Sequence, residues 1–77
     1  MILKILTSEK EIVNKKVDRV TLPGVVGEME ILPGHAKLVS ILKEGDVWFA
    51  AHPDNEKVPI RSGLVEVADN TVIALIE

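Results

Sequence analysis

Hydrophobic residues along this chain of 77 residues fall in short runs that alternate with polar residues. Alternation with a period of two sends successive side chains to opposite faces and predicts β-strands, and the Gly and Pro spacing leaves no room for a long amphipathic helix. The residue ranges predicted as strands are 1–6, 11–14, 17–22, 27–31, 38–42, 47–51, 58–61, 64–67 and 71–76. Ranges 11–14 and 17–22 are either two strands or one strand bent at Lys15 and Lys16.

Proline and glycine predict where these strands end. The tripeptide Leu-Pro-Gly occurs twice, and each copy is expected to stop a strand because Pro cannot donate a ladder hydrogen bond and Gly permits a turn. A further glycine is predicted at a bulge or tight corner. The residues expected to set backbone geometry in this way are Pro23, Gly24, Pro33, Gly34 and Gly63.

Two other turns are predicted from their residue types. Pro53-Asp54-Asn55 is expected at a hairpin tip, and Asp69-Asn70 is expected to form a two-residue turn that accepts positive φ. Together these elements predict an all-β fold. We expect one domain over residues 1–77, a small flattened β-sandwich or barrel of about eight to ten short, mostly antiparallel strands.

Composition narrows the function classes. Nine Lys and Arg stand against 12 Asp and Glu, for a formal net charge of -3, which disfavours nucleic-acid binding. The chain has no Cys, which excludes disulfides and thiolate metal ligands. Its longest apolar runs, 47–51 and 72–76, fall far short of the roughly 20 residues of a membrane-spanning helix. We therefore expect no membrane insertion and a cytoplasm-like compartment.

Candidate catalytic chemistry is sparse. His35 and His52 both flank turns, and two turn histidines do not make a recognisable metal site. Ser8, Ser40 and Ser62 lack the sequence context of a catalytic nucleophile. The sequence thus predicts no catalytic residue, cofactor or metal, although a small metal-dependent enzyme using His35 and His52 stays open as an alternative.

Glu28 and Glu30 are the most informative acids. Residues i and i+2 of a strand project from the same face, so these carboxylates should stand side by side while Met29 and Ile31 point the other way. They form either a solvated face or an acidic contact patch for a basic partner.

The chain's two aromatic residues, Trp48 and Phe49, are adjacent in a predicted strand. They must point to opposite faces, so one should fill the core while the other lies outside it. The apolar content also exceeds what a small sandwich can bury, which predicts exposed apolar surface at an interface.

One long stretch of the chain resembles a known family. Residues 22–38, LPGVVGEMEILPGHAKL, are similar to the ε subunit of F-type ATP synthases, and Pro-Gly-His-Ala after a short strand is a specific part of that likeness. The blocks SGLVEV (62–67), NTV (70–72) and LKILTSE (3–9) match the same family in order and spacing.

This resemblance implies a β-sandwich at the foot of the central stalk, held between the γ subunit and the membrane-embedded c-ring. It implies a non-catalytic rotor subunit that couples ion-driven rotation of the ring to ATP synthesis. The location implied is the cytoplasmic face of a bacterial membrane or the equivalent plastid face, as a peripheral part of the complex.

Members of that family usually continue into a C-terminal helical hairpin that can inhibit ATP hydrolysis, and this sequence ends before it. If the sequence is complete, the expected role is coupling and assembly without that inhibition. If it is a fragment, the expected role of this first domain is the same.

The resemblance also implies partner contacts. Glu28, Glu30 and His35 are expected to face the c-ring, whose polar loops are typically basic, and Ser40, Leu42 and Asp46 are expected to face γ. An alternative function is a stand-alone β-sandwich that binds a peptide along an exposed sheet edge.

Overall fold

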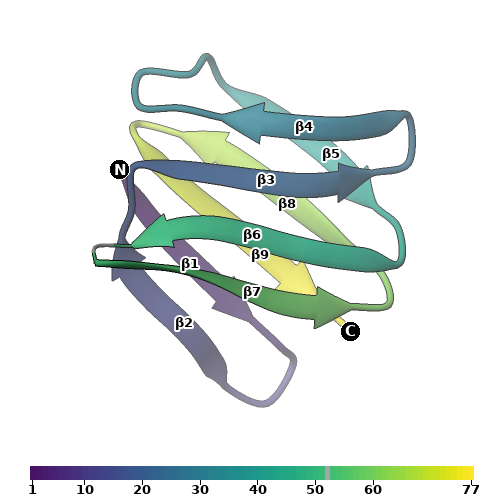
Figure 1. Ribbon diagram of the computed structural model, residues 1–77. Helices are drawn as coiled ribbons and strands as arrows, with labels where there is room; N and C mark the ends of the chain where they lie inside the picture. The colour runs from purple at the N-terminus through teal and green to yellow at the C-terminus, as the bar shows by residue number, and fades with distance from the viewer. Residues whose placement is uncertain (52) are drawn as a thin grey trace.

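The computed structural model describes residues 1–51 and 53–77, and this part of the chain forms nine strands and no helix (Figure 1). The strands are β1 (Ile2–Leu6), β2 (Glu11–Lys16), β3 (Arg19–Gly24), β4 (Gly27–Ile31), β5 (Leu38–Leu42), β6 (Gly45–Ala51), β7 (Asp54–Ile60), β8 (Gly63–Ala68) and β9 (Thr71–Ile76). The predicted all-β fold is confirmed.

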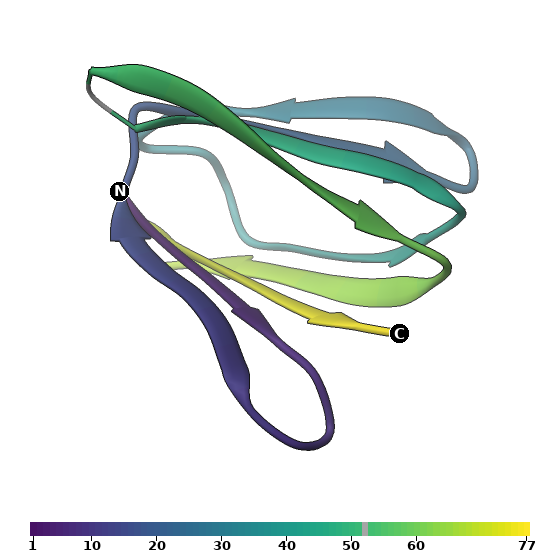
Figure 2. The same cartoon turned by 60° about the horizontal axis from the view of Figure 1, so that its bottom comes forward.

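The strands form two layers that face each other (Figure 2). One layer has the order β4-β3-β6-β7 and the other β2-β1-β9-β8-β5. The pairs are antiparallel except β1 with β9, which run parallel. The layers join where β3 meets β5 through the single residue pair Gly24 and Leu42. The sheet is therefore continuous but sharply curled at this corner.

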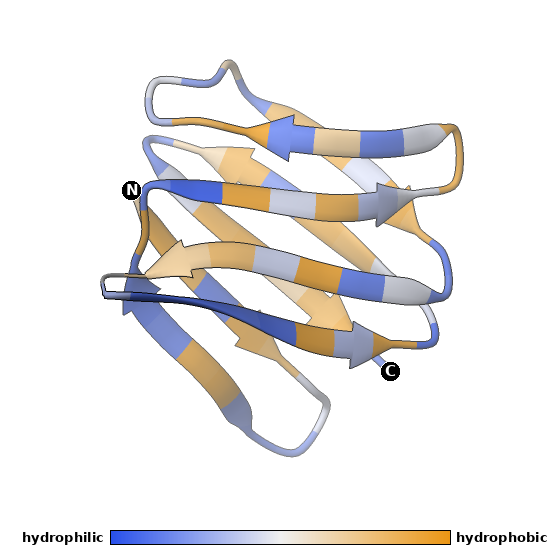
Figure 3. Cartoon of the chain, viewed as in Figure 1, coloured by the Kyte–Doolittle hydropathy of each residue, from blue (hydrophilic) through white to orange (hydrophobic). Residues whose placement is uncertain are grey.

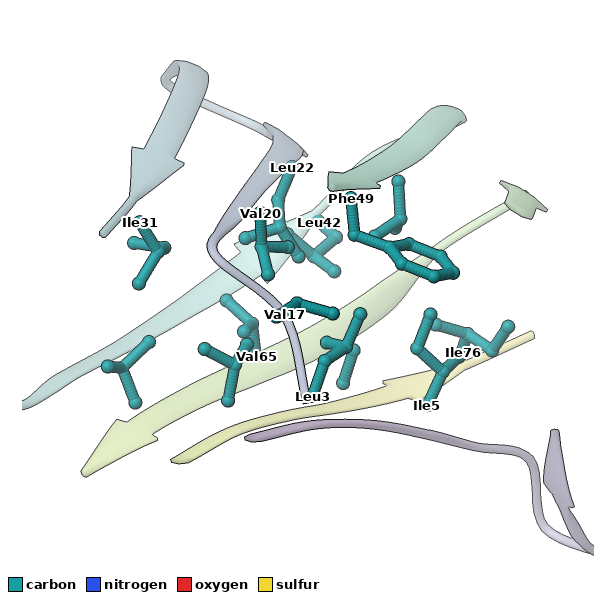
Figure 4. Packing of buried hydrophobic residues seen from close by; sticks show 14 of the residues in the cluster. Leu3, Ile5, Val17, Val20, Leu22, Ile31, Leu42, Phe49, Val65 and Ile76 are labelled. Atoms are coloured by element: carbon teal, nitrogen blue, oxygen red, sulfur yellow. The ribbon is translucent and has the colours of Figure 1, made fainter. Parts of the chain in front are cut away.

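The core lies between the two layers and is entirely apolar among the described residues. Leu3, Ile5, Val65 and Ile76 from one layer face Val20, Leu22 and Phe49 from the other, as Figure 4 shows. Alternation explains this arrangement, because each strand turns every second residue inward.

Several strand ends differ from the sequence-based prediction. β3 does not stop at Leu22 but continues through Pro23 and Gly24, which pair with Glu28 and Gly27. The Pro23 nitrogen cannot donate, but its carbonyl accepts a hydrogen bond from the Lys43 amide at 2.8 Å. The proline is therefore accommodated within the strand.

Gly63 is neither a bulge nor a turn. It is the first residue of β8 and pairs in regular register with Leu42 and Ile76. A Cβ at this position would lie 2.6 Å from the Leu75 carbonyl oxygen, so close approach of the neighbouring backbone requires glycine here. The register irregularity lies elsewhere, between Ile5 and Leu6 in the β1–β2 ladder.

The Asp69-Asn70 turn is confirmed, with φ of 51° and 60° at the two residues. Positive φ at both positions is the geometry of a type I′ hairpin. The Asn70 Oδ1 also accepts a hydrogen bond from the Gly34 amide at 2.7 Å. This bond ties the loop between β4 and β5 to the β8–β9 turn.

Candidate functional site

The paired acids lie on the outer face of β4 as predicted. Glu28 and Glu30 are exposed, whereas Met29 is partly buried and Ile31 is in the core. The Glu30 Oε2 lies 3.9 Å from the Arg19 Nε, and both side chains are about half exposed. Because exposed ion pairs contribute little, Glu30 can exchange Arg19 for another cation at low cost.

His35 lies apart from the two acids. It lies in the exposed loop that follows β4, at the opposite end of that strand from Gly27. Its amide donates to the Leu32 carbonyl at 3.1 Å, and its Nδ1 lies 2.7 Å from the Ala36 carbonyl oxygen. The structure therefore places Glu28 and Glu30 on one face but does not bring His35 to them. His52, its partner in the metal hypothesis, lies outside the described residues.

The three residues predicted to face γ do not share a surface. Ser40 lies on the inward-facing side of β5, and Asp46 lies on the outer face of β6 in the other layer, 3.9 Å from the Lys57 ammonium. Leu42 is 1% exposed and belongs to the core. The prediction for Leu42 is therefore wrong, because its side chain faces the interior and is not available to a partner.

The aromatic residues separate as predicted. Phe49 is 3% exposed and fills the core, whereas Trp48 is 47% exposed on the opposite side of β6. The Lys57 ammonium lies 5.0 Å from the centre of the Trp48 ring. This is a cation–π distance, so Trp48 is part of a polar outer face. A hollow of about 250 Å³ on this face is lined by Arg19, Thr21, Glu28, Trp48, Phe49 and Asn55.

The outer face of the other layer is apolar. Val39 and Ile41 on β5, Leu64 on β8 and Leu75 on β9 are 41–63% exposed. Cross-strand pairing places Ile41, Leu64, Leu75 and Leu6 in one row across four strands. Figure 3 shows β9 orange over most of its length, whereas blue and orange alternate along β3 of the other layer. We call this surface, formed by the outward residues of β5, β8, β9 and β1, the apolar face.

An open hollow of about 470 Å³ lies at one end of the apolar face. It is lined by Leu6, Thr7, Ser8, Ile41, Leu42, Ser62, Gly63, Leu64, Leu75, Ile76 and Glu77. A predominantly apolar hollow beside exposed Leu and Ile side chains is suited to receive apolar side chains of a protein partner.

The sequence prediction of surplus apolar surface is thus confirmed, but it did not locate that surface. The signal was present in LVSIL (38–42) and VIALI (72–76), where apolar residues occupy both alternating sets of positions. When a strand is apolar on both faces, one face packs in the core, and the other is exposed to water unless a partner covers it.

The open edges of β2, β4 and β7 suit peptide capture poorly. β2 ends in Lys15 and Lys16, β4 carries two exposed glutamates, and β7 contains Pro59. Charges and proline on edge strands disfavour pairing with another strand. The exposed faces of the sandwich are therefore better candidates for partner binding than its edges.

Within residues 1–51 and 53–77, no three His, Asp or Glu residues are grouped as metal ligands would be. The same residues contain no helix long and apolar enough to cross a membrane.

Comparison with protein families gives a match over residues 1–77 to the ATP synthase delta/epsilon chain β-sandwich domain. Among curated proteins, the chain is 38% identical to the ATP synthase epsilon chain of Carboxydothermus hydrogenoformans, across 95% of this chain and 54% of that protein. It is 40% identical to the epsilon chain of Lawsonia intracellularis, across 97% of this chain and 56% of that protein. The chain thus spans about half the length of these curated relatives.

Solved structures share the fold. A chain in the cryo-EM structure of the Euglena gracilis mitochondrial ATP synthase, OSCP/F1/c-ring, matches with a TM-score of 0.91 and 24% identity, covering 99% of this chain and 49% of that chain. A chain in the Tetrahymena thermophila mitochondrial ATP synthase central stalk/c-ring structure matches with a TM-score of 0.81 and 19% identity, covering 99% of this chain and 62% of that chain.

Proposed function

The chain belongs to the family of ATP synthase delta/epsilon β-sandwich domains, and from this premise we propose that it serves as a non-catalytic subunit of the central stalk. In this role it links the γ subunit to the c-ring and so couples ion-driven rotation to ATP synthesis. The proposed location is peripheral, on the cytoplasmic face of a bacterial membrane or the equivalent plastid face.

The apolar face carries this proposal. Its exposed aliphatic side chains come from several strands and lie in register, so they form a continuous surface rather than scattered single residues. Contiguous exposed apolar surface indicates a protein interface. We assign this face to γ, with Ile41, Leu64 and Leu75 in place of the buried Leu42.

The acidic pair supports a separate contact on the opposite layer. Glu28 and Glu30 project from the outer face of β4, whereas the apolar face lies on the other side of the sandwich. A subunit with two distinct outer faces can contact two partners at once. We assign Glu28 and Glu30 to basic groups of the ring, and His35 to the same partner as a separate contact beyond the end of β4.

Binding to purified γ subunit tests the first assignment. The 77-residue chain should form a stable one-to-one complex, and Ile41→Asp should weaken it at least about tenfold because a carboxylate would be buried against an apolar partner. Leu32→Asp is the matched control, since Leu32 is 48% exposed in the loop that follows β4, outside the four strands that form the apolar face. Absence of binding by the parent chain, or equal losses in both variants, would refute the assignment.

The second assignment is tested with purified c-ring or the whole complex. Glu28→Lys with Glu30→Lys should weaken attachment to the ring and leave the fold intact. Glu9→Lys with Glu11→Lys makes the same charge change on exposed residues of the β1–β2 hairpin and should have little effect. If the ring binds the β4 double variant as well as the parent, the charge assignment is wrong.

A further inference from the structure

The apolar face carries two charges in a particular arrangement. Glu66 on β8 pairs with Ile73 on β9, and Ile73 pairs on its other side with Lys4 on β1. Their strand neighbours, among them Leu3, Val65 and Val72, are buried, so all three point outward. An acid and a base thus stand one strand to either side of a central isoleucine. Neither has an ion-pair partner among the described residues.

This arrangement is complementary to itself. Consider a two-fold axis that lies on the apolar face, parallel to β9 and passing over Ile73. Rotation about this axis places a second copy face to face with the first, with β9 over β9, β8 over β1 and β1 over β8. Glu66 of each copy then faces Lys4 of the other, and Ile73 faces Ile73. Such an isologous contact forms every interaction away from the axis twice.

The neighbouring row obeys the same symmetry. Leu75 is the residue of β9 in that row, with Leu64 on one side and Leu6 on the other. Under the same axis Leu75 faces Leu75, and Leu64 faces Leu6 of the second copy. Two packed sheets cross at about 30°, which displaces side chains one strand from the axis by only about 2–3 Å, within reach of Lys and Glu.

The size of the face indicates how tightly two copies would hold. The molecule extends over 26 × 24 × 19 Å, so its larger face has a projected area on the order of 600 Å², below the roughly 800 Å² per partner of a stable interface. Two copies should therefore associate reversibly. A larger partner that covers more surface would displace the second copy.

We propose that the free chain forms a two-fold symmetric dimer through the apolar face, held in register by reciprocal Lys4–Glu66 ion pairs. The dimer is a property of the chain alone and does not depend on the proposed stalk function. It covers the apolar residues of the three central strands, Leu6, Leu64, Ile73 and Leu75, while the chain has no other partner.

Sedimentation at increasing concentration tests this proposal. The apparent mass should rise from 8.4 kDa toward twice that value as the chain is concentrated to about 1 mM. Lys4→Glu and Glu66→Lys should each raise the dissociation constant at least about tenfold, because each variant places like charges opposite one another. The double variant, Lys4→Glu with Glu66→Lys, should restore dimerisation because it inverts both reciprocal pairs.

Lys43→Glu and Glu44→Lys are matched controls, since they make the same charge changes in the exposed β5–β6 turn and should leave the dissociation constant unchanged. Urea unfolding of each variant checks that the fold is retained. A parent chain that stays monomeric throughout would overturn the proposal. A dimer that is insensitive to Lys4→Glu, or a double variant that fails to recover, would place the contact elsewhere and overturn it as well.

Discussion

At the scale of single residues, Trp48 and Phe49 show how strongly strand geometry determines environment. Phe49→Ala should lower the free energy of unfolding by about 3–5 kcal/mol, because it removes a side chain that is 3% exposed and leaves a cavity. Trp48→Ala should cost about 1 kcal/mol, mainly by exposing neighbours and removing the Lys57 contact. Urea unfolding measures both values. Equal losses would contradict the opposite orientations of the two rings.

Because Phe49→Ala can remove most of the stability of so small a domain, Phe49→Leu provides a second measurement. It keeps most of the buried volume and should cost less than the alanine variant, in proportion to the smaller cavity. A Phe49→Leu protein as stable as the parent would show that the ring contributes little to the core.

Gly63 is constrained by distance to a neighbouring backbone. Gly63→Ala should lower the free energy of unfolding by about 1–3 kcal/mol, since the new methyl group would lie 2.6 Å from the Leu75 carbonyl oxygen. Ser62→Ala changes the exposed neighbouring residue and should stay within about 0.5 kcal/mol of the parent. Urea unfolding compares the two. A Gly63→Ala variant as stable as its control would mean that β8 and β9 separate easily at this point.

At the scale of elements, the β8–β9 turn combines two effects that can be separated. Asn70→Ala should lower the free energy of unfolding by about 1 kcal/mol through loss of the hydrogen bond to Gly34. It should lower it by about 1 kcal/mol more because alanine is strained at the positive φ of this position. Asn70→Gly loses the same hydrogen bond without that backbone strain. The difference between the two variants in urea unfolding reports this strain less the greater entropy of glycine in the unfolded chain, about 0.4–1 kcal/mol. An Asn70→Ala variant more stable than Asn70→Gly by that full amount would contradict the observed φ of Asn70.

Sequence patterns predicted the positions of the strands better than their ends and their buried faces. Alternation located the strands because burial of every second residue is a local property of the sequence. It placed the end of β3 wrongly, since the Pro23 carbonyl is satisfied by Lys43, a residue twenty positions away. It misassigned Leu42 because LVSIL is apolar on both faces, and only packing against the second layer decides which face becomes the core.

For the candidate site, Glu28 and Glu30 could be predicted as neighbours because they lie on one strand. The separation of Ser40 from Asp46 could not, since these residues belong to different layers and their relation depends on the corner between β3 and β5. In the row of Ile41, Leu64 and Leu75, the last two residues pair within the local β8–β9 hairpin, but the place of Ile41 requires the pairing of β5 with β8, which a local pattern does not indicate.

At the scale of the whole molecule, one core serves both layers, so they should unfold together. Trp48 fluorescence reports on the first layer, and a backbone amide of β9 followed by NMR reports on the second. Both should give the same urea midpoint, as expected for a small domain with a single core. Separate midpoints would mean that the Gly24–Leu42 corner divides the molecule into independently folding parts.

The parallel pairing of β1 with β9 has a consequence for biosynthesis. β1 is among the first segments to leave the ribosome, yet one of its two neighbours in the sheet, β9, ends at Ile76. Until that residue emerges, Leu3 and Ile5 lack the strand that places Val72 and Ala74 beside them in the core. Translation must therefore run to the last strand of the domain before its second layer can close, and the nascent chain exposes an unfinished sheet until then.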